Sequence, residues 1–113
     1  MKTRFKKISA IADELLSYCH RHGANEFHID ITGENDFVTL VISARTGNIS
    51  NEELESLKNR LNAPRRRDVE QDFWELIGES ESSSELTLTG MLCDAACVNY
   101  DGKVLTISLT RYD

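Results

Sequence analysis

Apolar residues recur at steps of three and four along the first part of the chain. The series consists of Phe5, Ile8, Ile11, Ala12, Leu15, Leu16 and Cys19. This spacing predicts an amphipathic helix from about Arg4 to about His22, with one face packed on a core. Gly23 provides a natural stop after it, because glycine adopts a positive φ without a Cβ clash.

Two strand-like segments follow this helix. Glu26 to Thr32 alternates apolar and polar residues, which is the period of a strand. Phe37 to Ser43 is rich in β-branched residues, which favour strands. Because the turn residues Gly33 to Asp36 separate the two segments, we expect an antiparallel hairpin. An irregular loop, Ala44 to Ile49, follows it.

Two further helices are predicted in the middle of the chain. Ser50 begins the first, and Glu53 stands at the spacing of a capping box, in which each side chain bonds the other's backbone N–H. Pro64 ends or bends this helix. Asp68 to Glu79 predicts a shorter helix, and the polar, acidic segment Glu79 to Ser84 predicts a mobile loop, either a plain linker or a lid over a pocket.

The last third of the chain contains the most ambiguous segment and the strongest turn signal. Leu86 to about Cys97 fits a buried helix, although its beginning also fits a strand, and Gly90 weakens both interpretations. Asp101-Gly102 predicts a hairpin between Cys97 to Tyr100 and Lys103 to Thr110.

This order of elements predicts an α+β fold. Four strands in two hairpins, with helices between them, fit a two-layer α/β sandwich in which helices cover one face of a mixed, mostly antiparallel sheet. At 113 residues, we expect residues 1–113 to form a single domain.

Charge narrows the classes of partner. The 13 Lys and Arg residues against 19 Asp and Glu residues give a net charge of −6. An acidic surface argues against binding to nucleic acid or to an anionic membrane. Arg65-Arg66-Arg67 is the local exception, and we interpret it as a solvated loop or helix start in preference to a phosphate-binding patch. Without a signal-peptide pattern or a membrane-spanning segment, we expect a soluble, cytoplasmic protein.

Cysteines and histidines do not predict a metal site. The three cysteines are an odd number, which does not indicate a disulfide framework. Cys93 and Cys97 stand four residues apart on an expected helix, and we interpret them as buried packing residues. His20 and His22 stand two apart, so a helix directs them to different faces.

One stretch carries a resemblance to a known family. Glu14-Leu-Leu-Ser-Tyr-Cys-His-Arg-His-Gly23 resembles the first motif of the histidine-kinase-like ATPase domain, which reads roughly Glu-Leu-Leu-Ser-Asn-Ala-x-Lys-His-Gly. Sensor histidine kinases, anti-sigma-factor kinases, type II topoisomerases and related chaperones share this domain.

The later segments follow the order of the same family. Ala44 to Ile49 takes the place of a loop that reads Asp-x-Gly-x-Gly-Ile, and a helix follows it. Phe73-Trp74 resembles an aromatic stretch before the family's lid. Thr87 to Leu92, followed by Asp101-Gly102, resembles the last motif, Gly-x-Gly-Leu with a helix and a Gly-Gly hairpin. The resemblance covers almost the whole chain.

The resemblance implies a nucleotide pocket beside the first helix. Glu14 lies at or near the position of a catalytic glutamate, although a solvated helix carboxylate is an equally simple interpretation. The implied nucleotide-binding positions are Ser17, Tyr18, Arg21, His22, Thr46, Asn48, Ile49, Thr87, Thr89 and Gly90.

The sequence differs from the family at the positions that bind the metal ion, the adenine and the phosphates. The asparagine that holds Mg²⁺ is replaced by Tyr18, and a phenol is a poor magnesium ligand. The aspartate that binds the adenine amino group is replaced by Ala44, whose methyl group accepts no hydrogen bond. Residues with a Cβ also replace the loop and lid glycines and hinder the approach of phosphate to the backbone. These residues are Thr46, Asn48, Thr87 and Thr89.

Three hypotheses follow. The first is a degenerate domain, a pseudoenzyme that acts in signal transduction by binding a protein partner, as an anti-sigma-like module does; self-association as a homodimer stays open. The second is an active ATP-binding domain of an anti-sigma-factor Ser/Thr kinase or sensor histidine kinase, with Mg-ATP as its cofactor. In that case Glu14 would act as the base, Ser17 or Tyr18 would lie near the phosphates, and the lid would contain Thr89 and Gly90. The third is an unrelated α+β domain with a different strand order.

Overall fold

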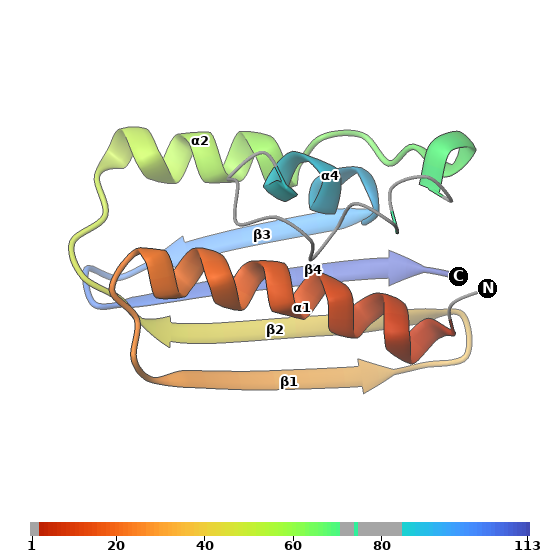
Figure 1. Ribbon diagram of the computed structural model, residues 1–113, viewed down its shortest axis with the longest axis horizontal. Coiled ribbons are helices and arrows are strands. Elements are labelled where there is room, and N and C mark those ends of the chain that lie inside the picture. Colours follow the sequence, from red (N-terminus) through yellow and green to blue (C-terminus); the bar gives the residue numbers. More distant parts are fainter. Residues whose placement is uncertain (1–2, 71–73, 75–84) are drawn as a thin grey trace.

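The computed structural model describes residues 3–70, 74 and 85–113. Figure 1 shows the elements in chain order. They are α1 (Arg4–Arg21), β1 (Phe27–Gly33), β2 (Phe37–Arg45), α2 (Asn51–Leu61), the 3-10 turn η1 (Arg67–Val69), α4 (Glu85–Met91), β3 (Ala95–Tyr100) and β4 (Val104–Tyr112). Most of the helix expected at Asp68 to Glu79, Phe73 and the loop expected at Glu79 to Ser84 lie outside the described residues.

The four strands form one sheet in the order β1-β2-β4-β3. All three neighbouring pairs are antiparallel, so the prediction of a mixed sheet is wrong. The strands of each hairpin are antiparallel because a short turn connects them. The hairpins meet where β2 pairs with β4, and these two strands also run in opposite directions. The two hairpins therefore build a single antiparallel sheet.

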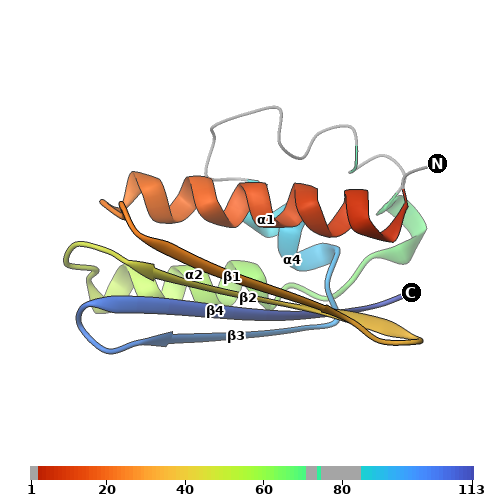
Figure 2. The same cartoon turned by 90° about the horizontal axis from the view of Figure 1, so that it is seen from below.

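Burial alternates residue by residue along both central strands, so the sheet has one core face and one more accessible face. The core face carries Val38, Leu40, Ile42 and Ala44 from β2 and Leu105, Ile107 and Leu109 from β4. Helix α1 packs on β2 and helix α2 on β3, and Figure 2 shows α1 as a layer over the sheet. The predicted α+β two-layer arrangement is confirmed.

The first helix begins and ends as its sequence predicts. The hydroxyl of Thr3 accepts a hydrogen bond from the N–H of Lys6 at 3.2 Å, which caps the N-terminus. Gly23 follows the helix with a φ of +90°, and the N–H of Ala24 returns to the carbonyl of Cys19. The predicted apolar stripe is buried at Ile8, Ile11, Ala12, Leu15 and Cys19.

Two boundaries differ from the prediction. Strand β2 continues to Arg45, so Ala44 belongs to the sheet and not to the following loop, because it pairs with both Phe27 and Leu105. The ambiguous segment divides into a helix that ends at Met91 and a strand that begins at Ala95.

The predicted hairpin at Asp101-Gly102 is confirmed. Its Asp101 carboxylate accepts hydrogen bonds from the N–H groups of Lys103 at 2.9 Å and Val104 at 2.7 Å, and Gly102 has a φ of +98°. Among the described residues, no helix is long and apolar enough to cross a membrane.

Candidate functional site

The nucleotide-binding residues that the resemblance implies within α1 fall on two sides of this helix. Tyr18 lies on the side that faces α2, where its hydroxyl reaches Glu53. Ser17 and Arg21 lie on another side of the helix and line a surface groove beside β1. The structure therefore does not gather all the expected helix residues in one pocket.

Tyr18 fills the space between the two helices. Its side chain is only 1% exposed, and its ring lies 4.4 Å from that of His22, centroid to centroid. Its hydroxyl donates a hydrogen bond to Oε2 of Glu53 at 2.8 Å. The same oxygen accepts a hydrogen bond from Arg60 at 3.1 Å, so the phenol belongs to a polar cluster that ties α1 to α2.

The surroundings of Tyr18 keep its phenol protonated. Burial, followed by the hydrogen bond to Glu53 and the negative charge of that residue, raises the pKa of Tyr18 above its ordinary value. A neutral phenol that donates a hydrogen bond to a carboxylate offers no anionic oxygen to a metal ion.

Ser50 and Glu53 show one half of the predicted capping box. The hydroxyl of Ser50 accepts a hydrogen bond from the N–H of Glu53 at 3.1 Å. The Oε2 atom of Glu53 is directed to Tyr18 and Arg60 instead. The residue expected to cap α2 therefore also connects α2 to α1.

The loop after β2 is fixed by hydrogen bonds at the end of α1. The N–H of Gly47 donates to the carbonyl of His22 at 3.0 Å, and that of Thr46 donates to the carbonyl of Lys103 at 3.0 Å. The hydroxyl of Tyr100 donates to the carbonyl of Gly47 at 3.0 Å and accepts from the N–H of Ile49 at 3.2 Å. The end of α1 and this loop therefore lie together.

Within this loop, the side chains differ in exposure. Ile49 is buried in the core, whereas Asn48 is exposed. The hydroxyl of Thr46 donates to the carbonyl of Gly47 at 3.0 Å. Ala44, which the resemblance aligns with an adenine-binding aspartate, is 1% exposed and lies in the core face of β2.

The last implied motif lies in a helix. Thr87, Thr89 and Gly90 all belong to α4, and Thr89 is fully buried. Gly90 packs against the end of α2: a Cβ atom there would overlap the carbonyl oxygen of Arg60 and lie 2.9 Å from that of Leu61. Close approach between two helices accounts for a glycine at this position.

Glu14 is only 4% exposed, so its interpretation as a solvated helix carboxylate is wrong. Glu14 lies in α1 one turn before Tyr18. Since positions four apart share a helix face, the two residues lie on the same side of the helix. Sequence alone does not show this burial, because Glu14 lies beside the predicted apolar stripe.

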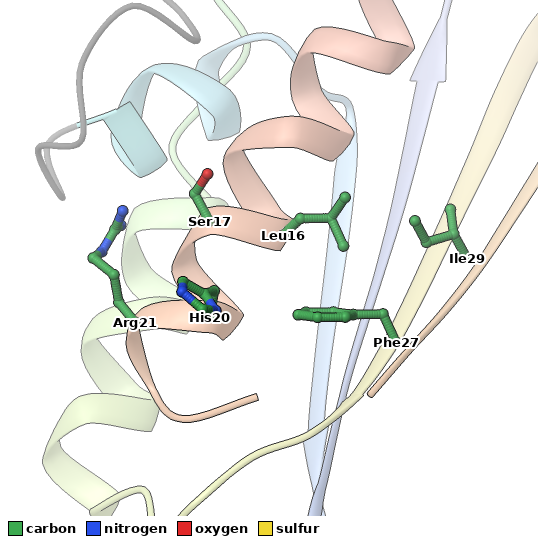
Figure 3. A pocket seen from close by; sticks show the side chains of 6 residues that line it. All are labelled: Leu16, Ser17, His20, Arg21, Phe27 and Ile29. Atoms are coloured by element: carbon green, nitrogen blue, oxygen red, sulfur yellow. The ribbon is translucent and has the colours of Figure 1, made fainter. Parts of the chain in front are cut away.

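A groove of about 640 Å³ lies between α1 and β1. Figure 3 shows Leu16, Phe27 and Ile29 directed toward one another from the helix and the strand. Ser17, His20 and Arg21 complete the lining. The alternating pattern predicts the strand, but it contains no signal that β1 lies at the edge of the sheet with its apolar face partly uncovered.

Metal-binding groups do not converge in the part of the chain that the structure describes: it holds no cluster of three or more His, Cys, Asp or Glu side chains. Cys93 is buried after α4, whereas Cys97 is exposed on β3. The expectation that both are buried on one helix is therefore wrong, because the chain changes from helix to strand between them.

Arg65 is also placed differently from its prediction. Its side chain is 7% exposed and bonds Glu70 and Asp94, both at 2.6 Å. Arg66 is exposed and pairs with Asp68 at 3.0 Å. Two of the three arginines, Arg66 and Arg67, are solvated as expected, whereas Arg65 joins a buried ion network.

Comparison with known proteins identifies no family for this chain. No family model matches it, and no curated protein shows significant similarity to it.

Proposed function

We propose that the chain is a degenerate histidine-kinase-like ATPase domain that has no catalysis of its own and acts by binding a regulatory protein partner. The observation that carries this proposal is the state of Tyr18. At the position that the resemblance assigns to a magnesium-binding asparagine stands a buried phenol that donates a hydrogen bond to Glu53.

Two further positions support the loss of nucleotide binding. Ala44, in place of the adenine-binding aspartate, is a buried strand residue without a side-chain acceptor. Gly90, which the resemblance places in the lid, packs against the backbone of α2. At Tyr18, Ala44 and Gly90, packing contacts stand where the resemblance implies groups for nucleotide binding, which supports the proposal.

The size of these losses is large enough to matter. An unsatisfied adenine amino group costs about 1–3 kcal/mol, and loss of a metal that polarises the phosphates costs several kcal/mol more. Together these changes weaken a micromolar affinity to beyond about 1 mM.

Isothermal titration of the full chain with Mg-ATP and with Mg-ADP tests the proposal. We expect no binding tighter than about 100 µM for either nucleotide. Binding tighter than this limit would overturn the degenerate interpretation.

The active-kinase hypothesis has one observation in its favour, the burial of Glu14. Its test is phosphotransfer from labelled ATP to candidate acceptor proteins by the parent chain and by Glu14→Gln. Transfer by the parent that Glu14→Gln abolishes would support a catalytic base at this position. Under our proposal neither chain transfers phosphate.

A further inference from the structure

The two edge strands of the sheet, β3 and β1, differ in how far their core-facing side chains are covered. On β3, the core face is covered by α2, and Val98 is only 8% exposed. On β1, the corresponding face carries Ile29 at 43% and Ile31 at 42% exposure. Figure 1 shows β1 as the outermost strand, with α1 lying on its inner side. One edge of the sheet thus keeps an uncovered apolar surface.

Among the described residues, no second strand pairs with the backbone of β1 along this edge. At the two ends of its ladder with β2, the N–H of Arg45 donates to the carbonyl of Glu26, and the N–H of Glu34 donates to the carbonyl of Phe37. Bonded and non-bonded positions alternate along an antiparallel pair, so the even-numbered residues of β1 bond β2. The N–H and C=O groups of Phe27, Ile29 and Ile31 therefore point away from the sheet.

We propose that β1 pairs antiparallel with β1 of a second copy of the chain, with the two Ile29 residues opposite each other at a two-fold axis. The outward-pointing groups of Phe27 and Ile31 then bond each other across the junction, and the two four-stranded sheets become one. The proposal is independent of whether the chain binds nucleotide.

Charge complementarity selects this register. On the other face of β1, His28 and Asp30 are both exposed. With the two Ile29 residues opposite each other, His28 of each copy lies opposite Asp30 of the other, twice per dimer. An imidazole can donate a hydrogen bond to a carboxylate and attracts it when protonated, and cross-strand pairs of this kind stabilise a sheet.

The neighbouring two-fold registers oppose like charges. If the two-fold axis moves by one residue, which slides the two strands by two residues, Asp30 lies opposite Asp30 and Glu26 opposite Glu34. If the axis moves by one residue in the other direction, Glu26 lies opposite Asp30. Like charges directly opposite destabilise a strand pair. The proposed register also joins the apolar residues of both β1 strands between the two α1 helices.

Cysteine cross-linking tests the register directly. In a Cys97→Ser background, which removes the exposed thiol, we expect Ile29→Cys to form a covalent dimer under mild oxidation. Ile31→Cys is the matched control, because Ile31 has the same exposure and face. Its two copies would lie about 14 Å apart along the junction, beyond the reach of a disulfide. Equal cross-linking of both variants, or of neither, would overturn the register.

Sedimentation equilibrium between about 1 µM and 1 mM tests the dimer and its charge pairs. We expect the parent chain to dimerise and His28→Asp to raise the dissociation constant about tenfold or more, because it replaces two attractions with two repulsions. The exchange His28→Asp with Asp30→His restores both pairs and should restore the affinity.

The control for the added charge is Asn99→Asp, on the exposed side of the other edge strand, and it should leave the dissociation constant unchanged. A parent chain that stays monomeric up to about 1 mM would overturn the proposal. A dimer that His28→Asp leaves unchanged would do so as well.

Discussion

Tyr18 illustrates how one side chain changes the chemistry of a helix face. An asparagine at this position presents an amide oxygen as a ligand, whereas Tyr18 presents a hydroxyl donor on a larger, aromatic side chain. The donor is satisfied by Glu53, and the ring stacks beside His22. In this chain the side chain of Tyr18 therefore forms a contact between α1 and α2.

Tyr18→Phe tests this contact. The variant keeps the ring in the core and removes the hydroxyl, so Glu53 loses a donor in a half-buried site. We expect the free energy of unfolding, measured by urea denaturation, to fall by about 1–2 kcal/mol.

The matched control is Tyr112→Phe, because Tyr112 is 47% exposed. It should change the free energy of unfolding by no more than about 0.5 kcal/mol. Equal effects at the two positions would show that the bond from Tyr18 to Glu53 contributes nothing to stability.

At the scale of elements, the strongly periodic segments were predictable from the sequence. The apolar stripe of α1, the alternation in β1, the cap at Ser50 and the turn at Asp101 each have a local cause, and the structure contains all of them. The segment from Leu86 to Cys97 was not predictable, because short apolar runs fit helix and strand equally. The helix formed by its first part, α4, packs against α1 and α2, and these tertiary contacts are not visible in the local sequence.

Gly90 shows why a motif position needs the packing around it. Sequence reasoning linked this glycine to a phosphate lid, whereas the structure places it where α4 touches the end of α2. A glycine is required in either case, since both arrangements bring another group close to the backbone. The sequence therefore could not separate the two explanations.

Gly90→Ala distinguishes close helix packing from an open lid. In an unhindered helix, alanine is more favourable than glycine by about 1 kcal/mol. Here the new Cβ would meet the backbone carbonyls of Arg60 and Leu61, which cannot move without shifting α2. We expect the free energy of unfolding to fall by about 1–3 kcal/mol, measured by urea denaturation.

Gly33→Ala is the control for this substitution. The Cβ there would approach only the flexible end of Arg4, at 3.2 Å, so we expect little change in stability. A Gly90→Ala chain that is more stable than its parent would contradict the packing of α4 against α2.

At the scale of the whole molecule, a partly buried ion network joins segments that are distant in sequence. Arg65 bonds Glu70, Asp94 and the carbonyl of Tyr112, and Arg111 bonds Glu70 and the carbonyl of Leu92. The network thus connects the segment after α2, the turn before β3 and the end of β4. The sequence could not predict it, because its members become neighbours only through the strand order.

Glu70 is the centre of this network, and its ionisation links it to acid stability. Burial by itself would raise the pKa of Glu70, but the hydrogen bonds and charges of Arg65 and Arg111 outweigh burial and hold the pKa below its ordinary value of 4.5. A carboxylate with a lowered pKa stabilises the fold at pH values above the ordinary one. This stabilisation is lost as the pH falls through the lowered pKa.

Glu70→Gln should therefore destabilise the chain at neutral pH and much less in acid. Because the variant leaves two buried guanidinium groups without their shared carboxylate, we expect a loss of about 2 kcal/mol at pH 7. The difference from the parent should shrink as the pH falls below 4.5, the ordinary pKa of the group. Urea denaturation at a series of pH values measures both quantities. The control is Asp68→Asn, which breaks the exposed pair with Arg66 and should leave stability at neutral pH nearly unchanged. If the effect of Glu70→Gln did not depend on pH, the charge of Glu70 would not be what holds these segments together.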